Sequence, residues 1–283
     1  MESLKERIKT IKKRRPGYAL ILDFYEKVRS EQEHAKGSVK TGPIVLKPQW
    51  KELLAREGFP LLQPKDFSLD TATTVHLLHS LCQIAKRANP RMAEEASKIE
   101  RFLEKESSQL EEALRVGWEE KKIEAIADHF GFDRNIFVFL VLNSVKPSVE
   151  SGMEKLRTEV TPEDWSKGHC PICGSLPQLS LLREEVGKRY LLCSFCSHEW
   201  RIERLVCPFC HSREPRSLHY LSGEGEEGYR ADLCENCHAY LKTIDTRKIE
   251  TVDPLLEDIA SLHLDLAASA KGFHRPVPNR WTA

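Results

Sequence analysis

Four C-x-x-C pairs constrain this 283-residue chain more than any other feature, because they hold eight of its nine cysteines. Nineteen residues separate the first two pairs, and twenty-three separate the last two. Each pair can direct two sulfur atoms at one metal ion, and a second pair completes a tetrahedral thiolate site. The pairs are CPIC at 170–173, CSFC at 193–196, CPFC at 207–210 and CENC at 234–237. This spacing indicates two copies of one small unit.

The repeat assigns the paired cysteines to two sites of four ligands. An interleaved pairing, which joins the first pair to the third and the second to the fourth, ignores the repeat but stays open. A unit of about forty residues rarely folds without metals or disulfides. A structural zinc site contributes roughly 10–16 kcal/mol at neutral pH, so we predict two metal ions, iron or zinc. The predicted ligands are Cys170, Cys173, Cys193 and Cys196 for one ion, and Cys207, Cys210, Cys234 and Cys237 for the other.

The start of the chain, MESLKERIKTIKKRRPG, is charged throughout and lacks the apolar core of a secretory signal. The longest apolar run, 136–142, is far shorter than the roughly twenty residues that span a bilayer. We therefore expect a cytoplasmic protein without membrane insertion. Thiols stay reduced in the cytoplasm, so paired cysteines indicate metal or redox chemistry there and not structural disulfides.

The residues before about 165 carry the apolar periodicity of helices. The stripes lie at 68–88, 96–114 and 123–130, with a cap at Asn89 and helix ends at Gly117 and Gly131. The run 136–145 is apolar on nearly every side and stops before Pro147, as expected of a helix in the middle of a core. We expect a helical bundle.

After Pro162 the chain changes to short strand-like pieces, and after Asp253 one amphipathic helix should end near Gly272. The predicted fold class is α+β multidomain. It consists of an N-terminal helical bundle, two tandem rubredoxin-like (zinc-ribbon-like) modules and a C-terminal helix. The predicted domains are 1–165 for the bundle, 166–206 and 207–250 for the two modules, and 251–283 for the last helix and the tail.

Other uses of the paired cysteines fit less well. A thioredoxin-like dithiol needs one pair at a helix N-terminus, whereas four pairs occur here in a strand-and-turn setting. CPFCH and CENCH match a haem-attachment pattern, but haem attachment would require export and would leave two pairs unexplained. The GEGEEG string at 223–228 holds glutamates that would repel a pyrophosphate, so we expect a hairpin loop. No catalytic or cofactor-binding residue can be named.

Charge argues against a nucleic-acid partner. Residues 170–245 hold nine Lys and Arg against eleven Asp and Glu, a net charge of −2. A divalent ion with four thiolates adds −2 at each site, which brings this region to about −6 and would repel a phosphate backbone.

The cysteine region resembles the FdhE family of formate dehydrogenase accessory proteins over about residues 165–270. The motifs that carry the resemblance are CPICGSLP (170–177), RYLLCSFCSHEW (189–200), RLVCPFC (204–210), LHYLS (218–222), DLCENCHAYLKTID (232–245) and LLEDIASLHLDL (255–266). The resemblance implies a cytoplasmic maturation factor with a helical N-terminal domain and two rubredoxin-like modules. It also implies that the catalytic subunit of formate dehydrogenase is the partner, and that the eight paired cysteines are the metal ligands.

The first hypothesis is therefore a non-enzymatic assembly factor, since a closed four-thiolate site is structural or electron-carrying. The alternative is a thiol-redox or sulfur-handling enzyme that uses one exposed C-x-x-C pair and keeps a single metal. A nucleic-acid-binding zinc ribbon is a third hypothesis. The sequence leaves the choice between iron and zinc, the partner-binding surface and the oligomeric state open.

Overall fold

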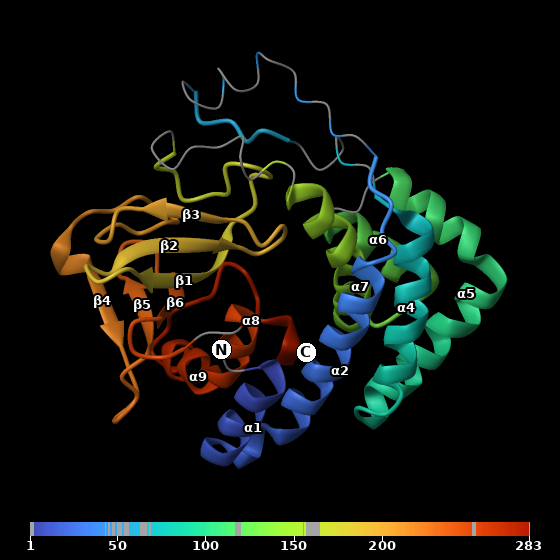
Figure 1. Ribbon diagram of the computed structural model, residues 1–283, viewed down its shortest axis with the longest axis horizontal. Coiled ribbons are helices and arrows are strands. Elements are labelled where there is room, and N and C mark those ends of the chain that lie inside the picture. Colours follow the sequence, from blue (N-terminus) through green and yellow to red (C-terminus); the bar gives the residue numbers. More distant parts are fainter. Residues whose placement is uncertain are drawn as a thin grey trace. The chain divides into compact units, whose positions relative to one another are not determined.

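The computed structural model (Figure 1) describes residues 3–42, 44, 46, 49, 53, 57–62, 67, 69–116, 120–154, 156, 165–250 and 253–282. They form two compact units. The helical unit comprises the described residues of Gly17–Val45, Leu62–Lys155 and Asn279–Ala283, and the sheet unit those of Met1–Pro16, Leu46–Leu61 and Leu156–Pro278. The predicted helix end at Gly117 and the predicted change at Pro162 lie outside the described residues. The division into four domains stays a prediction.

Local sequence signals explain most helices of the helical unit. These helices are α2 (Ala19–Lys36), α4 (Thr71–Ala85), α5 (Pro90–Val116), α6 (Glu120–Phe130), α7 (Arg134–Glu154) and the short 3₁₀-helix η6 (Arg280–Thr282). Asn89 accepts the backbone N–H of Met92 at 2.9 Å, so the predicted cap of α5 is confirmed. Gly131 has a φ of 70° and ends α6 as predicted.

The predicted end of the central helix before Pro147 is wrong, because α7 continues to Glu154. A proline inside a helix has no N–H for the carbonyl four residues earlier, here that of Asn143. The side-chain amide of Gln32, a buried residue of α2, donates to this carbonyl oxygen at 2.9 Å instead. The hydrogen bond from Gln32 thus replaces the one that the Asn143 carbonyl oxygen loses because residue 147 is a proline.

The sheet unit joins both cysteine modules in one six-stranded sheet, with the order β3-β2-β1-β6-β5-β4. The strands are β1 (Pro177–Arg183), β2 (Lys188–Cys193), β3 (Glu199–Ile202), β4 (Leu218–Leu221), β5 (Tyr229–Cys234) and β6 (Tyr240–Asp245). Neighbouring strands within each module are antiparallel. Strands β1 and β6 pair in parallel, with Leu181 opposite Ile244, and so link the two modules.

In the described part of the sheet unit lie the helices α1 (Leu4–Arg14), α8 (Pro254–Ala260) and α9 (Leu262–Ala270), and the short 3₁₀-helix η5 (Pro215–Ser217). Helix α1 begins with a capping box of Ser3 and Glu6. Its Arg7 donates to the buried carboxylate of Glu257 on α8, at 2.7 and 2.9 Å. Helices α8 and α9, red in Figure 1, contact β6, and α9 also contacts β5.

The single C-terminal helix predicted after Asp253 is wrong, because it is broken into α8 and α9 at Ser261. The Ser261 hydroxyl donates to the carbonyl oxygens of Glu257 and Asp258, at 2.8 and 3.2 Å. The ammonium group of Lys242 also donates to the Asp258 carbonyl oxygen, at 2.7 Å. A cation at the C-terminal end of a helix is favourable, so these contacts end α8 at this point.

The predicted α+β class is confirmed, with a helical N-terminal part followed by a sheet that carries two four-cysteine clusters. Of the helices in the described part of the chain, none has the length and apolar character needed to cross a bilayer.

Candidate metal centres

All four C-x-x-C pairs form the same tight turn. The first cysteine of each pair donates its backbone N–H to the carbonyl oxygen five residues later. These bonds are Cys170 to Ser175, Cys193 to His198 and Cys207 to Ser212, each 2.9 Å, and Cys234 to Ala239, 3.0 Å. The residue after the second cysteine always has a positive φ. It is Gly174 (75°), Ser197 (55°), His211 (59°) or His238 (52°). This shared backbone shape turns both sulfur atoms of a pair to the same side.

The first cluster brings together the sulfur atoms of Cys170, Cys173, Cys193 and Cys196, and all four side chains are buried. The Cys173 sulfur lies 3.4 Å from that of Cys193 and 3.6 Å from that of Cys196. A tetrahedron around a metal with metal–sulfur bonds of 2.3 Å has edges of about 3.8 Å. The observed spacing is therefore close to that of a tetrathiolate metal site.

The second cluster brings together Cys207, Cys210, Cys234 and Cys237. Its sulfur atoms lie 3.7 Å apart between Cys207 and Cys237, and 3.6 Å apart between Cys210 and Cys234. In contrast to the first cluster, Cys210 is exposed and Cys237 is half-buried. The two clusters thus have the same geometry but different access to solvent.

Backbone N–H groups point at the sulfur atoms. The N–H groups of Phe195 and Cys196 each lie 3.4 Å from the Cys193 sulfur. Such hydrogen bonds stabilise a sulfur atom that carries negative charge, as a metal-bound thiolate does. Burial acts in the opposite direction, since it raises the pKa of Cys170 well above its usual range and that of Cys237 to about 11.

Four sulfur atoms at these distances cannot all be anionic in a buried place unless a cation balances them. The donor set, the tetrahedral spacing and the N–H groups therefore fit a bound metal ion. Soft thiolate ligands in this geometry suit zinc or iron.

No histidine takes part in the two four-cysteine groups found among the described residues. His169 instead lies with its Nε2 atom 3.2 Å from the carbonyl oxygen of Gly58. His211 and His238 occupy the positive-φ positions of the turns. His211 and His238 therefore belong to the backbone of the turns, and His169 makes a polar contact with Gly58.

Arg189 connects the first module to the second cluster. It lies on β2, is buried, and donates to the carbonyl oxygen of Val206 at 2.9 Å. Val206 directly precedes Cys207. Arg189 also donates to the Ser180 hydroxyl at 2.9 Å and lies 3.3 Å from a carboxylate oxygen of Asp232.

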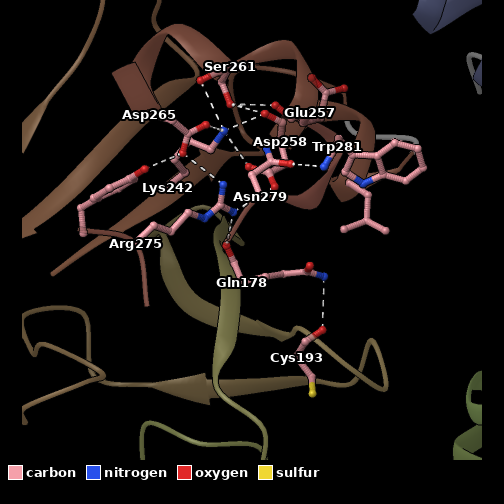
Figure 2. Close-up of polar contacts among 12 residues, drawn as sticks. Gln178, Cys193, Lys242, Glu257, Asp258, Ser261, Asp265, Arg275, Asn279 and Trp281 are labelled. Atoms are coloured by element: carbon pink, nitrogen blue, oxygen red, sulfur yellow. Dashed lines mark hydrogen bonds and ion pairs between the residues drawn. The ribbon is translucent and has the colours of Figure 1, made fainter. Parts of the chain in front are cut away.

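A buried polar network reaches the first cluster from the C-terminal helices (Figure 2). Lys242 on β6, only 1% exposed, pairs with Asp258 and Asp265, each at 2.6 Å. Arg275 pairs with the same two carboxylates and donates to the backbone oxygen of Gln178 at 2.8 Å. The Gln178 side chain in turn donates to the backbone oxygen of Cys193 at 3.3 Å. This network holds a turn of the first cluster against the rest of the sheet unit.

Sequence reasoning missed both Arg189 and the Lys242 network. An isolated arginine or lysine in a strand gives no signal, because its partners are distant in the sequence. The one available sign was that Lys242 alternates with the apolar residues Tyr240 and Ile244 in YLKTID, which places a charge on their face of the strand.

Both clusters lie in segments shared with known proteins. The family model described as "FdhE, central domain" matches residues 169–204, and the one described as "FdhE, C-terminal domain" matches residues 205–281. A "Protein FdhE homolog" of Haemophilus influenzae (strain PittEE) is 31% identical over 236 residues, and the match covers 81% of this chain and 72% of that protein. This chain belongs to the FdhE family.

Two further FdhE proteins extend the comparison. The "Protein FdhE homolog" of Aquifex aeolicus (strain VF5) is 34% identical over 161 residues, and the match covers 55% of this chain and only 56% of that protein. The crystal structure of the FdhE protein from Pseudomonas aeruginosa shares the fold, with a TM-score of 0.68, 24% identity, and coverage of 98% of this chain and 94% of that one. The FdhE resemblance predicted from the cysteine motifs is confirmed.

The two FdhE family models divide the sheet unit between the cysteine clusters. The central-domain match contains the first cluster with β1–β3. The C-terminal match contains the second cluster with β4–β6 and helices α8 and α9. In this FdhE chain the division falls between Arg204 and Leu205, and Arg189 donates to the carbonyl oxygen of the next residue, Val206.

Proposed function

We propose that this protein is a cytoplasmic accessory factor that formate dehydrogenase requires for its maturation and activity. In this proposal it binds the catalytic subunit of that enzyme and is not itself an enzyme. The observation that carries the proposal is the FdhE match over 81% of the chain, together with the two four-cysteine clusters. The FdhE family is the family of formate dehydrogenase accessory proteins that the cysteine motifs resemble.

The eight paired cysteines are the proposed ligands of two ions, iron or zinc. A metal bound in this way supplies a fixed cross-link between two turns and, if it is iron, a one-electron redox couple. The chain's own residues prepare the site. Backbone N–H groups donate to the Cys193 sulfur, and Gln178 and Arg189 position the turns of the first and second cluster. Four protein ligands leave no open coordination position for a substrate, which supports a role in binding over a role in catalysis.

Deleting the gene tests this function directly. We expect formate dehydrogenase activity to be lost in the deletion strain and to return with the wild-type gene. A Cys170→Ser variant should fail to restore it, and a Cys82→Ser variant, which changes a thiol outside both clusters, should restore it. A pull-down with the purified catalytic subunit should show direct binding. Full formate dehydrogenase activity in the deletion strain would contradict the proposal.

One observation favours the alternative of a thiol-redox or sulfur-handling enzyme. Cys210 is exposed, in contrast to the buried cysteines of the first cluster. A thiol that reagents can reach is the kind that reacts. Metal analysis separates the two functions. The accessory factor should hold two ions and have no free thiol other than the buried Cys82, whereas the enzyme should hold one ion and leave a reactive pair.

A further inference from the structure

A cavity of about 250 Å³ lies beside the second cluster, and Cys207 and Cys234 line it. Helix α9 covers the other face of the sheet here, since its Leu264 and Ala268 pack with Ala231 and Leu233 of β5. Side chains alternate between the two faces of a strand, so Arg230 and Asp232 point away from α9 and into the cavity. The cavity thus belongs to the face of β5 that α9 does not cover.

Two large apolar side chains at this cavity are open to solvent. Leu205 is 70% exposed and Tyr220 is 65% exposed, and both line the cavity. Phe209, two residues after Cys207, is half-buried beside them. Exposed apolar side chains grouped around a hollow are typical of a surface that binds another protein, and aromatic residues often supply much of the binding energy.

The charged residues that line the cavity are three arginines and one aspartate. Asp232 forms ion pairs with two of these arginines, since its carboxylate oxygens lie 3.3 Å from Arg189 and 2.8 Å from Arg230. A divalent ion with four thiolates would carry a charge of −2, and the buried Arg189 lies where it can offset part of it. Arg204 is exposed and the Arg230 side chain is 26% exposed, so both can meet a carboxylate from outside.

Among the strands of the described residues, β4 stands at one end of the sheet, so one side of its backbone has no partner strand there. Glu235 donates its N–H to the Ser217 carbonyl oxygen, so residues 217, 219 and 221 are the ones that bond to β5. In an antiparallel pair the residues between them direct their N–H and C=O groups outward. Tyr220 therefore presents its backbone at the sheet edge next to the cavity, where an added strand can pair.

We propose that this surface, made by Arg204, Leu205, Phe209, Tyr220 and Arg230, docks an extended segment of the formate dehydrogenase catalytic subunit. The segment carries a bulky apolar side chain, which enters the cavity, next to a carboxylate, which meets Arg204 or Arg230. Its backbone pairs with β4. This inference rests on the proposed function and adds to it the place and the chemistry of the contact.

A binding titration with the purified catalytic subunit of the same organism tests the apolar contact. The double variant Leu205→Ser/Tyr220→Ser should bind at least tenfold more weakly than the wild type. The matched control is Leu266→Ser, which removes a leucine that is 74% exposed on α9, and it should bind like the wild type. Because all three side chains are exposed, each variant should keep the wild-type metal content and circular dichroism, and this is checked first.

The outcomes separate the surface from the function. If the wild type and the double variant bind equally well, this surface is not the docking site, while the proposed function stands. If the double variant and the Leu266→Ser control are weakened alike, the surface is likewise overturned. If the wild type does not bind the catalytic subunit at all, the partner is wrong and the proposed function fails together with the inference.

A second pair of variants tests the charge of the partner segment. Arg204→Glu reverses an exposed charge at the cavity, and Arg201→Glu reverses an exposed charge on β3 that does not line it. Arg204→Glu should weaken binding at least tenfold, and Arg201→Glu should change it less than twofold. Equal binding by both variants would show that no carboxylate meets Arg204 and would overturn that contact.

Discussion

At the scale of single residues, the turns of both clusters depend on the residue that follows the second cysteine of each pair. His211 has a φ of 59° and His238 a φ of 52°, in the left-handed region that most side chains avoid. Histidine enters this region more readily than a β-branched residue does. The backbone of the turn, and not metal binding by the ring, accounts for the position of these histidines.

This leads to a prediction for His211→Val. The substitution should destabilise the second cluster by about 1–2 kcal/mol, because a β-branched residue resists a positive φ. His211→Gly should be tolerated, since glycine adopts this conformation freely. The measurement is the midpoint of chelator-induced metal release. His219→Val, on the regular strand β4, is the control and should leave the midpoint unchanged. Equal midpoints for His211→Val and His211→Gly would contradict the account.

Asp133 caps α7, since its carboxylate accepts the backbone N–H of Ile136 at 3.1 Å, and this gives the stability of the helical unit a pH dependence. Partial burial raises the pKa of Asp133. Hydrogen bonds from Arg91 and from the Ile136 backbone together lower it by more, so the pKa lies below its ordinary value. The stability from this carboxylate is therefore complete above the unfolded-state pKa near 4 and is lost as the pH falls through the lower folded-state value. Asp133→Ala should cost about 1 kcal/mol at pH 7, the usual worth of a helix cap.

Urea unfolding at pH 7 and at pH 3, monitored by helical circular dichroism, checks this dependence. The difference between the wild type and Asp133→Ala should shrink at the lower pH. A difference that is the same at both pH values would show that the carboxylate charge at this cap does not contribute.

At the scale of elements, the passage of α7 through Pro147 depends on α2. Gln32→Leu removes the donor to the Asn143 carbonyl, and an unpaired buried carbonyl costs about 1–3 kcal/mol. Pro147→Ala restores a backbone N–H for the same carbonyl. We therefore expect Gln32→Leu to cost less in the Pro147→Ala background, and a double-mutant cycle of urea unfolding measures the difference. Strictly additive effects would show that the two residues do not serve the same group.

The sequence predicted those elements whose signals are local. The cap at Asn89, the end at Gly131 and the tight turns of the C-x-x-C pairs each depend on residues within a few positions. The two wrong helix ends depend on distant groups. Gln32 lies 111 positions from Asn143, and Lys242 lies 19 positions from Ser261, so periodicity and proline placement alone could not foresee them.

At the scale of the whole molecule, the repeat predicted two similar modules, but not that β1 and β6 join them in one sheet. A parallel pairing between segments about sixty residues apart leaves no mark in the spacing of cysteines. The same holds for Arg189, which extends from the first module to the chain before Cys207. These contacts make the two clusters parts of one unit.

Coupling between the modules gives a prediction for Arg189→Met. Loss of a residue that positions metal ligands lowers metal affinity roughly 10–100-fold in other proteins, and we expect a similar loss at the second cluster. The first cluster should be much less affected. Stopped-flow release of the two ions to a chelator separates their rates, with Arg201→Met as the exposed control. If Arg189→Met speeds metal release equally at both clusters, or at neither, Arg189 does not support the second cluster specifically.

The most direct measurement is metal analysis of protein purified without oxygen, combined with thiol titration and a visible absorption spectrum. We expect two ions per chain and no free thiol other than that of Cys82, which is buried. Absorption in the visible range would identify ferric thiolate, and its absence with zinc in the analysis would identify zinc. A metal-free protein whose segment from His169 to Asp245 is nevertheless fully folded would contradict the central claim that two metal ions organise this sheet.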